Sequence, residues 1–406
     1  MKFINELRKT SYLNFWRTLL SLAFIISFPF STAVNNISYV LLLLISLILS
    51  IKKKTSVKLT KLNIISVLVV VYLILDIILS GGFIKDSETI LRYLVLLSST
   101  LIFFDDRKFL FLFKKVYLII YGVFSIFIIY NLIEHYIEFD KFILHKSSVN
   151  VEQVLFFERL YFGLFSTIAS IITCSIFKKH KTFKFGLLIY ILLINFVIAT
   201  RLAFILVSLI GLSQIIFEIK SVLSLKRIIL FTFTFSLFLG LFSINDGFKK
   251  RFLLNSESYT DFILKFKINE PRYAIWKCTK TISLHNEKFN ILYGYASNIE
   301  LFDNLFQCYE EHVYIKEKRE WFLRDKLNTH NQFIHIFLLH GLFGFLLIIV
   351  LLGILLAYKN DLNSLYLLTT IIMFGMIESF IFRQIGVYLI AICFGLLTEN
   401  NKIAHK

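Results

Sequence analysis

The chain has little charge and almost no proline. Only 17% of its 406 residues are charged, 57% are hydrophobic, and the whole sequence contains two prolines. The mean hydropathy is +0.74. Soluble domains carry about 25% charged residues, and a soluble fold of this size cannot bury so much apolar surface. The composition therefore excludes an ordinary soluble protein and indicates a polytopic membrane protein.

The sequence also lacks the short alternating apolar and polar segments of a membrane β-barrel. Its apolar runs are continuous, as in SLAFIISFPF and LLIIVLLGILLAY, and they recur at the length of roughly 20 residues that a helix needs to cross a bilayer. We find no internal repeat and no low-complexity linker. The sequence thus predicts an all-α fold with a single membrane domain over residues 1–406.

The apolar runs predict about twelve membrane-spanning helices. The second and the last run are short, so ten or eleven spans remain an alternative, and Pro29 is expected to kink the first helix near its outer end. A large external loop, residues 246–331, is predicted between the ninth and tenth helices. The predicted spans are 13–31, 37–51, 62–80, 90–104, 116–133, 154–177, 183–199, 202–218, 228–245, 332–357, 364–380 and 385–397.

Lysine and arginine are unevenly distributed over the predicted loops. Basic clusters such as IKKKTSVKLTK and KKHKTFK fall in alternate loops, together with the basic residues near both termini. By the positive-inside rule, both termini are expected in the cytoplasm and the 246–331 loop outside. The net charge of +17 is therefore interpreted as a topology signal rather than a nucleic-acid-binding surface, because no single face gathers these lysines.

The external loop mixes charged and apolar residues, as in NLFQCYEEHVYIKEKREWFLRDKL. This pattern predicts amphipathic helices lying on or near the membrane surface rather than a separate globule. Cys278 and Cys308 both fall in this loop. A disulfide between them, worth about 3 to 4 kcal/mol, and two free thiols are both compatible with the sequence, and the cysteine spacing matches no metal motif.

Charged residues inside predicted spanning helices gather at the external helix ends. A site that acts on a lipid head group collects polar groups at one leaflet, whereas an ion pathway scatters them through the bilayer depth. The alternatives are that each side chain only extends to the nearest interface, or that Glu158 and Arg159 pair with other helices, for example Arg159 with Asp76 or Glu378. The residues concerned are Asp76, Arg92, Glu158, Arg159, Arg201, Glu378 and Arg383.

Three histidines precede or enter the tenth predicted helix. His330, His335 and His340 are spaced by five residues, which places successive rings about 140° apart on a helix and disfavours a shared metal ion. We interpret His335 and His340 as interfacial residues without a chemical role.

The segment from His330 to Gly344 resembles the signature of the bacterial O-antigen ligase family. His330-Asn331 is followed, nine residues later, by Gly341-Leu342-Phe343-Gly344, and the family signature has His and Asn, Ser or Gln, then nine residues, then Gly-x-x-Gly, Thr or Tyr. Arg201 in IATRLAF and Arg272 in NEPRYAIWK resemble two further family arginines, although Trp276 stands where the family has Leu. The resemblance covers roughly residues 158–344.

The resemblance implies a glycosyltransferase that moves a glycan from undecaprenyl diphosphate to an acceptor sugar. The resemblance further implies that the reaction takes place at the external side of the bacterial inner membrane, inverts the anomeric centre and uses no nucleotide or metal. His330 is the expected general base, and Arg201 and Arg272 are expected to stabilise the leaving diphosphate. A ligase acting on lipid A-core is favoured. Alternatives are a repeat-unit polymerase of the same superfamily and, from another class, a lipid-linked glycan transporter. The residues expected to contribute to substrate binding are Asn331, Arg159, Arg383 and Glu158.

Overall fold

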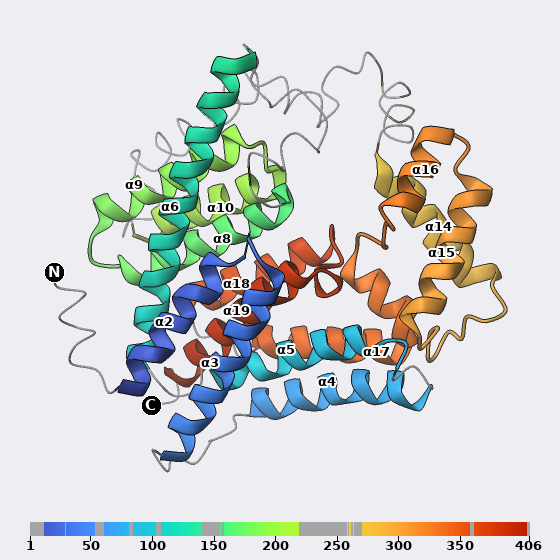
Figure 1. Ribbon diagram of the computed structural model, residues 1–406, viewed down its shortest axis with the longest axis horizontal. Helices are drawn as coiled ribbons and strands as arrows, with labels where there is room; N and C mark the ends of the chain where they lie inside the picture. Colours follow the sequence, from blue (N-terminus) through green and yellow to red (C-terminus); the bar gives the residue numbers. More distant parts are fainter. Residues whose placement is uncertain are drawn as a thin grey trace. The chain divides into compact units, whose positions relative to one another are not determined.

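Helices make up most of the residues that the computed structural model describes (Figure 1). Within these residues the only β pairing is an isolated bridge between Asn290 and Gly294. The chain divides into two compact units, residues 1–49 with 105–256 and residues 50–104 with 257–406. The described residues are 12–28, 30–52, 61–80, 84–102, 107–139, 158–218, 270–357 and 361–403, with the single residues 155, 258, 260 and 263.

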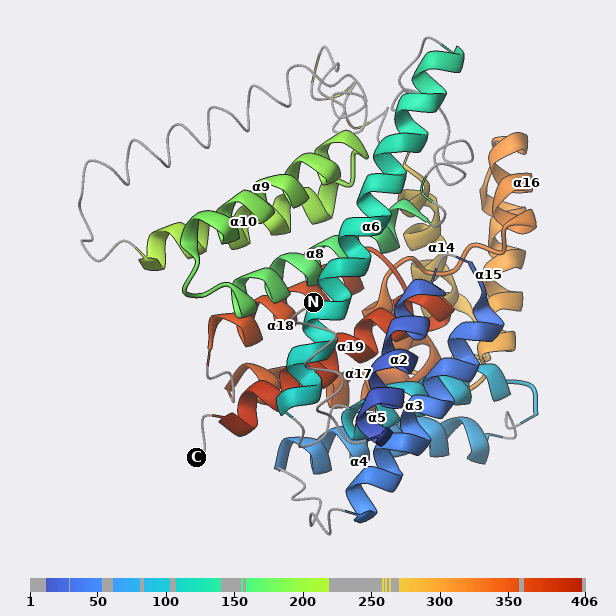
Figure 2. The same cartoon turned by 60° about the vertical axis from the view of Figure 1, so that its left-hand side comes forward.

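The first unit is organised around helix α8, which packs against α6, α9 and α10 (Figure 2). Every residue of α8 from Tyr161 to Cys174 is buried. At Gly163 an added Cβ would lie 3.0 Å from the Cβ of Ala203, so a small residue is needed for the approach of α8 to α10. The helices are α2 (Tyr12–Ile26), α3 (Thr32–Lys52, in this unit up to Leu49), α6 (Arg107–Phe139), α8 (Arg159–Ile176), α9 (Lys181–Val197) and α10 (Arg201–Glu218).

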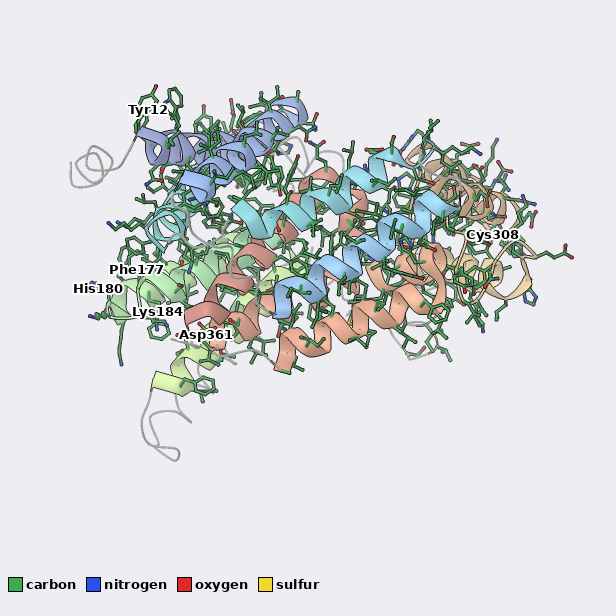
Figure 3. The ribbon with its side chains drawn as sticks, turned by 90° about the horizontal axis from the view of Figure 1, so that it is seen from below. Tyr12, Phe177, His180, Lys184, Cys308 and Asp361 are labelled. Atoms are coloured by element: carbon green, nitrogen blue, oxygen red, sulfur yellow. A yellow bond between two sulfur atoms is a disulfide. The ribbon has the colours of Figure 1, made fainter. Side chains whose placement is uncertain are left out.

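The second unit combines long apolar helices with a group of three shorter helices, α14, α15 and α16. α17 packs against α4 and α18, and α5 packs against α4 and α19, while α14, α15 and α16 pack in sequence and α14 and α15 also contact α17. Cys308 of α15 and Asp361 lie at opposite ends of α4, α5 and α17 (Figure 3). The elements are α4 (Lys61–Leu79), α5 (Ser87–Ile102), α14 (Pro271–His285), α15 (Asn298–His312), α16 (Lys316–Arg324), α17 (Gln332–Ala357), α18 (Leu362–Gly375), η2 (Phe380–Phe382) and α19 (Gln384–Ile403).

Helix α17 is broken at Gly341, where φ is 64° and ψ is −163°. The segment 290–296, which lies between α14 and α15, enters this break. Its amides at Tyr295 and Ala296 donate to the carbonyls of residues 338 and 339, and its carbonyls at Ile291 and Leu292 accept from the amides of residues 342 and 343, at 2.8 to 3.3 Å. The backbone groups left without helical partners are thereby satisfied, as an apolar surrounding requires.

The glycines of the Gly-x-x-Gly motif are explained by this break. A Cβ on Gly341 would lie 2.3 Å from the carbonyl of Leu292, and φ is left-handed there, so only glycine fits without strain. A Cβ on Gly344 would lie 2.3 Å from the Cβ of His340. The second glycine therefore makes room for the His340 side chain.

The predicted spans agree closely with the helices. Four described helices are long and apolar enough to cross a membrane, namely Thr32–Ile51, Lys108–Ile137, Arg159–Ile176 and Gln332–Ala357, and five shorter apolar helices accompany them. Every predicted span within the described residues overlaps a helix, while the span 228–245 and Pro29 lie outside them. The count of twelve stays a prediction. The span 364–380 was too long, because α18 ends at Gly375 and the following residues turn toward the segment before α17.

The segment 246–331, which the sequence predicts as an external loop, contains α14, α15 and α16 where it is described. α14 and α15 are joined by a disulfide between Cys278 and Cys308, which closes a separation of 30 residues. This decides between the two alternatives that the sequence left open. The position of these helices relative to a membrane surface stays a prediction.

Candidate functional site

His330 lies in a short segment that precedes α17 in the second unit. Its backbone is left-handed, with φ of 44°, a conformation that costs a residue other than glycine about 1 to 2 kcal/mol. The Asn328 side chain stabilises it by accepting the His330 amide at 2.9 Å. The Asn331 side chain then accepts the amides of Phe333 and Ile334, both at 3.0 Å. Asn331 therefore caps α17, which fixes where the helix begins relative to His330.

The imidazole of His330 is hydrogen-bonded to a buried carboxylate. Its Nδ1 lies 2.8 Å from Oε2 of Glu378, in the connection after α18. The side chain of His330 is 20% exposed and that of Glu378 only 7%. The other carboxylate oxygen of Glu378 accepts the amide of Ser379 at 3.1 Å. Nδ1 of His330 thus faces the fixed Glu378 carboxylate, while part of the His330 side chain remains exposed to solvent.

Arg272 lies at the start of α14, directly after Pro271. A cation is unfavourable at a helix N-terminus, and Glu270 offsets this, since its Oε1 accepts from Nη1 of Arg272 at 3.0 Å. Nε of Arg272 donates to the carbonyl of Ile377 at 3.2 Å. Because Ile377 immediately precedes Glu378, this contact brings Arg272 to the residues that hold His330.

Trp276 lies one turn further along α14 and binds the same segment. Its indole Nε1 donates to the carbonyl of Thr329 at 3.1 Å. The sequence marked Trp276 only as a departure from the family pattern. In the structure this residue fixes the backbone immediately before His330. α14 therefore supplies both Arg272 and the indole that holds the His330 segment in place.

A hydroxyl pair ties the His330 segment to the connection after α18. The hydroxyls of Thr329 and Ser379 lie 2.8 Å apart, and Ser379 Oγ also accepts the amide of Asn331 at 3.2 Å. Nδ2 of Asn331 donates to the carbonyl of Met376 at 3.0 Å. Thr329 and Ser379 are fully buried. These contacts hold the two segments together, so that the Glu378 carboxylate meets the His330 ring.

Glu378 is held in its ionised form. Burial raises the pKa of this carboxyl, but the charge and hydrogen bond of His330, the charge of Arg272 and the Ser379 amide together outweigh burial and leave the pKa below its ordinary value. An ionised carboxylate only accepts hydrogen bonds. The proton between the two residues is therefore assigned to Nδ1 of His330, and in the neutral ring Nε2 carries the lone pair.

The predicted site residues fall into both units. His330, Asn331 and Arg272 are brought together in the second unit through Glu378 and its neighbours. Arg383, between η2 and α19, is exposed. In the first unit, Arg201 begins α10, Arg159 begins α8, and Glu158 is the residue before α8. The buried Nη1 and Nη2 of Arg159 have no hydrogen-bond partner among the described residues.

The interpretation of His335 and His340 as interfacial residues was wrong. Both side chains are fully buried. His335 lies 3.2 Å from the Thr329 hydroxyl and 3.0 Å from Oδ1 of Asn298. His340 lies 2.6 Å from Asp76 and 2.9 Å from the Tyr93 hydroxyl. Sequence reasoning missed the contacts with Asn298, Tyr93 and Asp76 because these partners are 37 to 264 residues away.

Two acidic residues considered as partners of Arg159 bind histidines instead. Asp76 contacts His340 and Glu378 contacts His330. The charge of Glu378 within an apolar stretch indicated a functional residue, but the sequence did not indicate which residue Glu378 contacts. Within the described residues, no three His, Cys, Asp or Glu side chains are grouped so that they could hold a metal ion.

The helical fold with its apolar spans defines a polytopic helical membrane protein. Residues 186–349 match the protein-family model described as O-antigen ligase. This match confirms, over these residues, the resemblance to the O-antigen ligase family inferred from His330-Asn331 and the two glycines. The family is a glycosyltransferase-like superfamily, and together with the apolar helices it indicates a bacterial membrane protein. No curated protein matches the chain.

Proposed function

We propose that the chain is a ligase that transfers a glycan from undecaprenyl diphosphate to an acceptor sugar of lipid A-core, at the external face of the bacterial inner membrane. The observation that carries the proposal is the hydrogen bond between His330 and the buried Glu378. His330 lies within the family match, and Glu378 lies beyond its end. A histidine bonded to a carboxylate through Nδ1 presents Nε2 as a base.

The reaction needs a base for the acceptor hydroxyl. As the hydroxyl oxygen attacks the anomeric carbon, its proton passes to Nε2 of His330 and the bond to the diphosphate breaks. The ring becomes positively charged, and Glu378, 2.8 Å from Nδ1, stabilises that charge. Attack opposite the leaving diphosphate inverts the anomeric centre.

The leaving diphosphate needs cations. Arginine matches phosphate oxygens with two parallel donors, and charge that develops on the leaving group is stabilised by cations fixed in advance. Arg272 is held by Glu270 and the Ile377 carbonyl, which suits it to this role. Arg201 is proposed as the second cation. Arg159 and Glu158 are proposed to contribute to donor binding, and Asn331 to position His330 by capping α17.

The test is transfer by the purified protein with a defined undecaprenyl diphosphate-linked glycan. We expect His330→Ala, Arg201→Ala and Arg272→Ala to be inserted in the membrane but inactive. Full activity of His330→Ala would refute the role of the base. Supplying lipid A-core and lipid-linked repeat units separately distinguishes a ligase from a polymerase, because a polymerase lengthens the chain on undecaprenyl diphosphate. Transport of the donor across proteoliposomes without a covalent product would favour a transporter.

A further inference from the structure

The second unit contains a cationic cleft beside the His330 segment. Its volume is about 330 Å³, within the range of pockets that bind small ligands, roughly 300 to 1,000 Å³. Its walls come from α5, from the start of α15, from the end of α16 and the residues after it, and from the end of η2 and the connection to α19. The charged residues that line it are Arg92, Arg324, Lys326, Arg383, Glu88 and Asp325.

The cleft has an excess of positive charge. Asp325 is engaged by Arg324, whose Nε lies 2.9 Å from its Oδ1, and Glu88 is engaged by Arg92. The hydrogen bond from Arg324, with a smaller contribution from the charge of Arg383, keeps the pKa of Asp325 below its ordinary value. Each carboxylate is thus matched by one arginine. Lys326 and Arg383 supply the two charges in excess.

The cations are gathered by the fold rather than by one stretch of sequence. Arg92, Lys326 and Arg383 lie far apart in the chain and come from separate elements. Lys326 adopts a left-handed backbone with φ of 46°, a costly conformation for this residue type. The exposed side chains of Lys326 and Arg383 leave the cleft accessible from solvent.

The cleft adjoins the proposed base. Asn328 lines it, and the same side chain accepts the amide of His330 at 2.9 Å. Phe382 lines it as well and packs on the ring of His335, with ring centroids 3.7 Å apart. A ligand in the cleft therefore contacts the residue that holds the backbone of His330.

We propose that this cleft binds an anionic group, a phosphate or a carboxylate, carried by the acceptor saccharide. The inference rests on the proposed function, in which Arg201 and Arg272 bind the diphosphate of the donor and the acceptor hydroxyl must reach His330. The cations of the cleft, which lie beside the proposed base, are then in a position to bind the acceptor. Guanidinium and ammonium groups bind phosphate and carboxylate oxygens through charge-assisted hydrogen bonds. This assigns Arg383 to the acceptor rather than to the diphosphate.

The test measures binding and transfer separately. The full chain is placed in nanodiscs of phosphatidylcholine and titrated calorimetrically with a phosphorylated core oligosaccharide, before and after phosphatase treatment. The double variant Lys326→Gln/Arg383→Gln removes the excess charge. The matched control Lys288→Gln/Lys316→Gln removes two exposed external lysines that do not line the cleft.

We expect the double variant to bind the phosphorylated probe about tenfold or more weakly than the control variant, since charge-assisted hydrogen bonds to the phosphate are lost. The dephosphorylated probe should bind the two variants alike. Equal affinity of both variants for the phosphorylated probe overturns the inference. So does tight binding that is lost when phosphatidylglycerol is added to the nanodiscs, because the cleft would then hold a lipid head group.

The transfer activity of His330→Ala is measured on the same preparation. Loss of transfer together with unequal probe binding supports both proposals. Loss of transfer with equal probe binding removes only the acceptor site. Transfer retained by His330→Ala removes the role of His330 as the base, and absence of transfer by the unmodified protein removes the proposed function, whatever the probe does.

Discussion

Replacing Glu378 by Gln tests the proposed chemistry most directly. The substitution keeps the shape of the side chain and an oxygen that accepts from Nδ1 of His330, but it removes the negative charge. The Nδ1 to Oε2 distance is 2.8 Å, which places the centres of the two charges roughly 4 Å apart. At an effective dielectric constant of about 20, their attraction is about 4 kcal/mol. This attraction exists only when the ring is protonated, so it stabilises the transition state rather than the ground state.

The expected loss of kcat for Glu378→Gln is about 100- to 1,000-fold, because each 1.36 kcal/mol corresponds to a factor of ten. The lower end of this range allows for the partial exposure of His330, since solvent screening weakens the attraction between the two charges. Single-turnover transfer with saturating donor and acceptor measures this loss. Glu378→Asp retains the charge and should recover part of the rate. Glu311→Gln, on the exposed face of α15, is the control. A Glu378→Gln variant within threefold of the unmodified protein would refute the reasoning.

The same carboxylate predicts a dependence of stability on pH. The pKa of Glu378 is lowered on folding, so its contribution to stability is present above the ordinary glutamate value of 4.5 and is lost as the pH falls through the folded value. We expect the unfolding temperature to drop below about pH 4.5, and to drop less in Glu378→Gln. Parallel curves for the two proteins would contradict this prediction.

Three further changes test the support of the site. Trp276→Phe removes the indole donor to a buried carbonyl and should lower kcat about tenfold with little change in KM, since an unsatisfied buried group costs about 1 to 3 kcal/mol; wild-type kinetics would contradict it. Replacing both Cys278 and Cys308 by Ser should lower the free energy of unfolding by about 3 to 4 kcal/mol in the chain-entropy model, as measured by denaturant titration, whereas an unchanged midpoint would contradict it. Gly341→Ala should abolish folded yield, judged by size-exclusion chromatography, because its Cβ would overlap backbone at 2.3 Å. Gly353→Ala, where nothing lies within 4 Å, is the control and should fold normally.

Much of the fold was predictable from the sequence because membrane helices are specified locally. A run of apolar residues satisfies its own backbone hydrogen bonds as a helix wherever it lies, so each predicted span within the described residues overlaps a helix. The exact helix ends were harder to predict from the sequence. α18 stops at Gly375 because the residues after it bind the segment before α17, a contact that no local pattern encodes.

The candidate site was only partly predictable for the same reason. His330 and Arg272 were found through a motif, and Glu378 was noted as a charge in an apolar run. The contact of Glu378 with His330 spans 48 residues, and that of Trp276 with the Thr329 carbonyl spans 53. Such pairs depend on how α14, α17 and α18 pack, which one sequence does not specify. The relation of Arg201 to His330 stays a prediction.

The break in α17 links α14 and α15 to the proposed base. If the 290–296 segment left the break, four backbone hydrogen bonds would be lost at once, and each unsatisfied backbone group costs several kcal/mol in an apolar surrounding. The segment connects α14, which carries Arg272 and Trp276, to α15, and the disulfide joins those two helices again. α14 is therefore anchored to α17 independently of its own contacts with His330. This anchoring fixes Arg272 and His330 in place before substrate arrives, as the stabilisation of developing charge by preorganised groups requires.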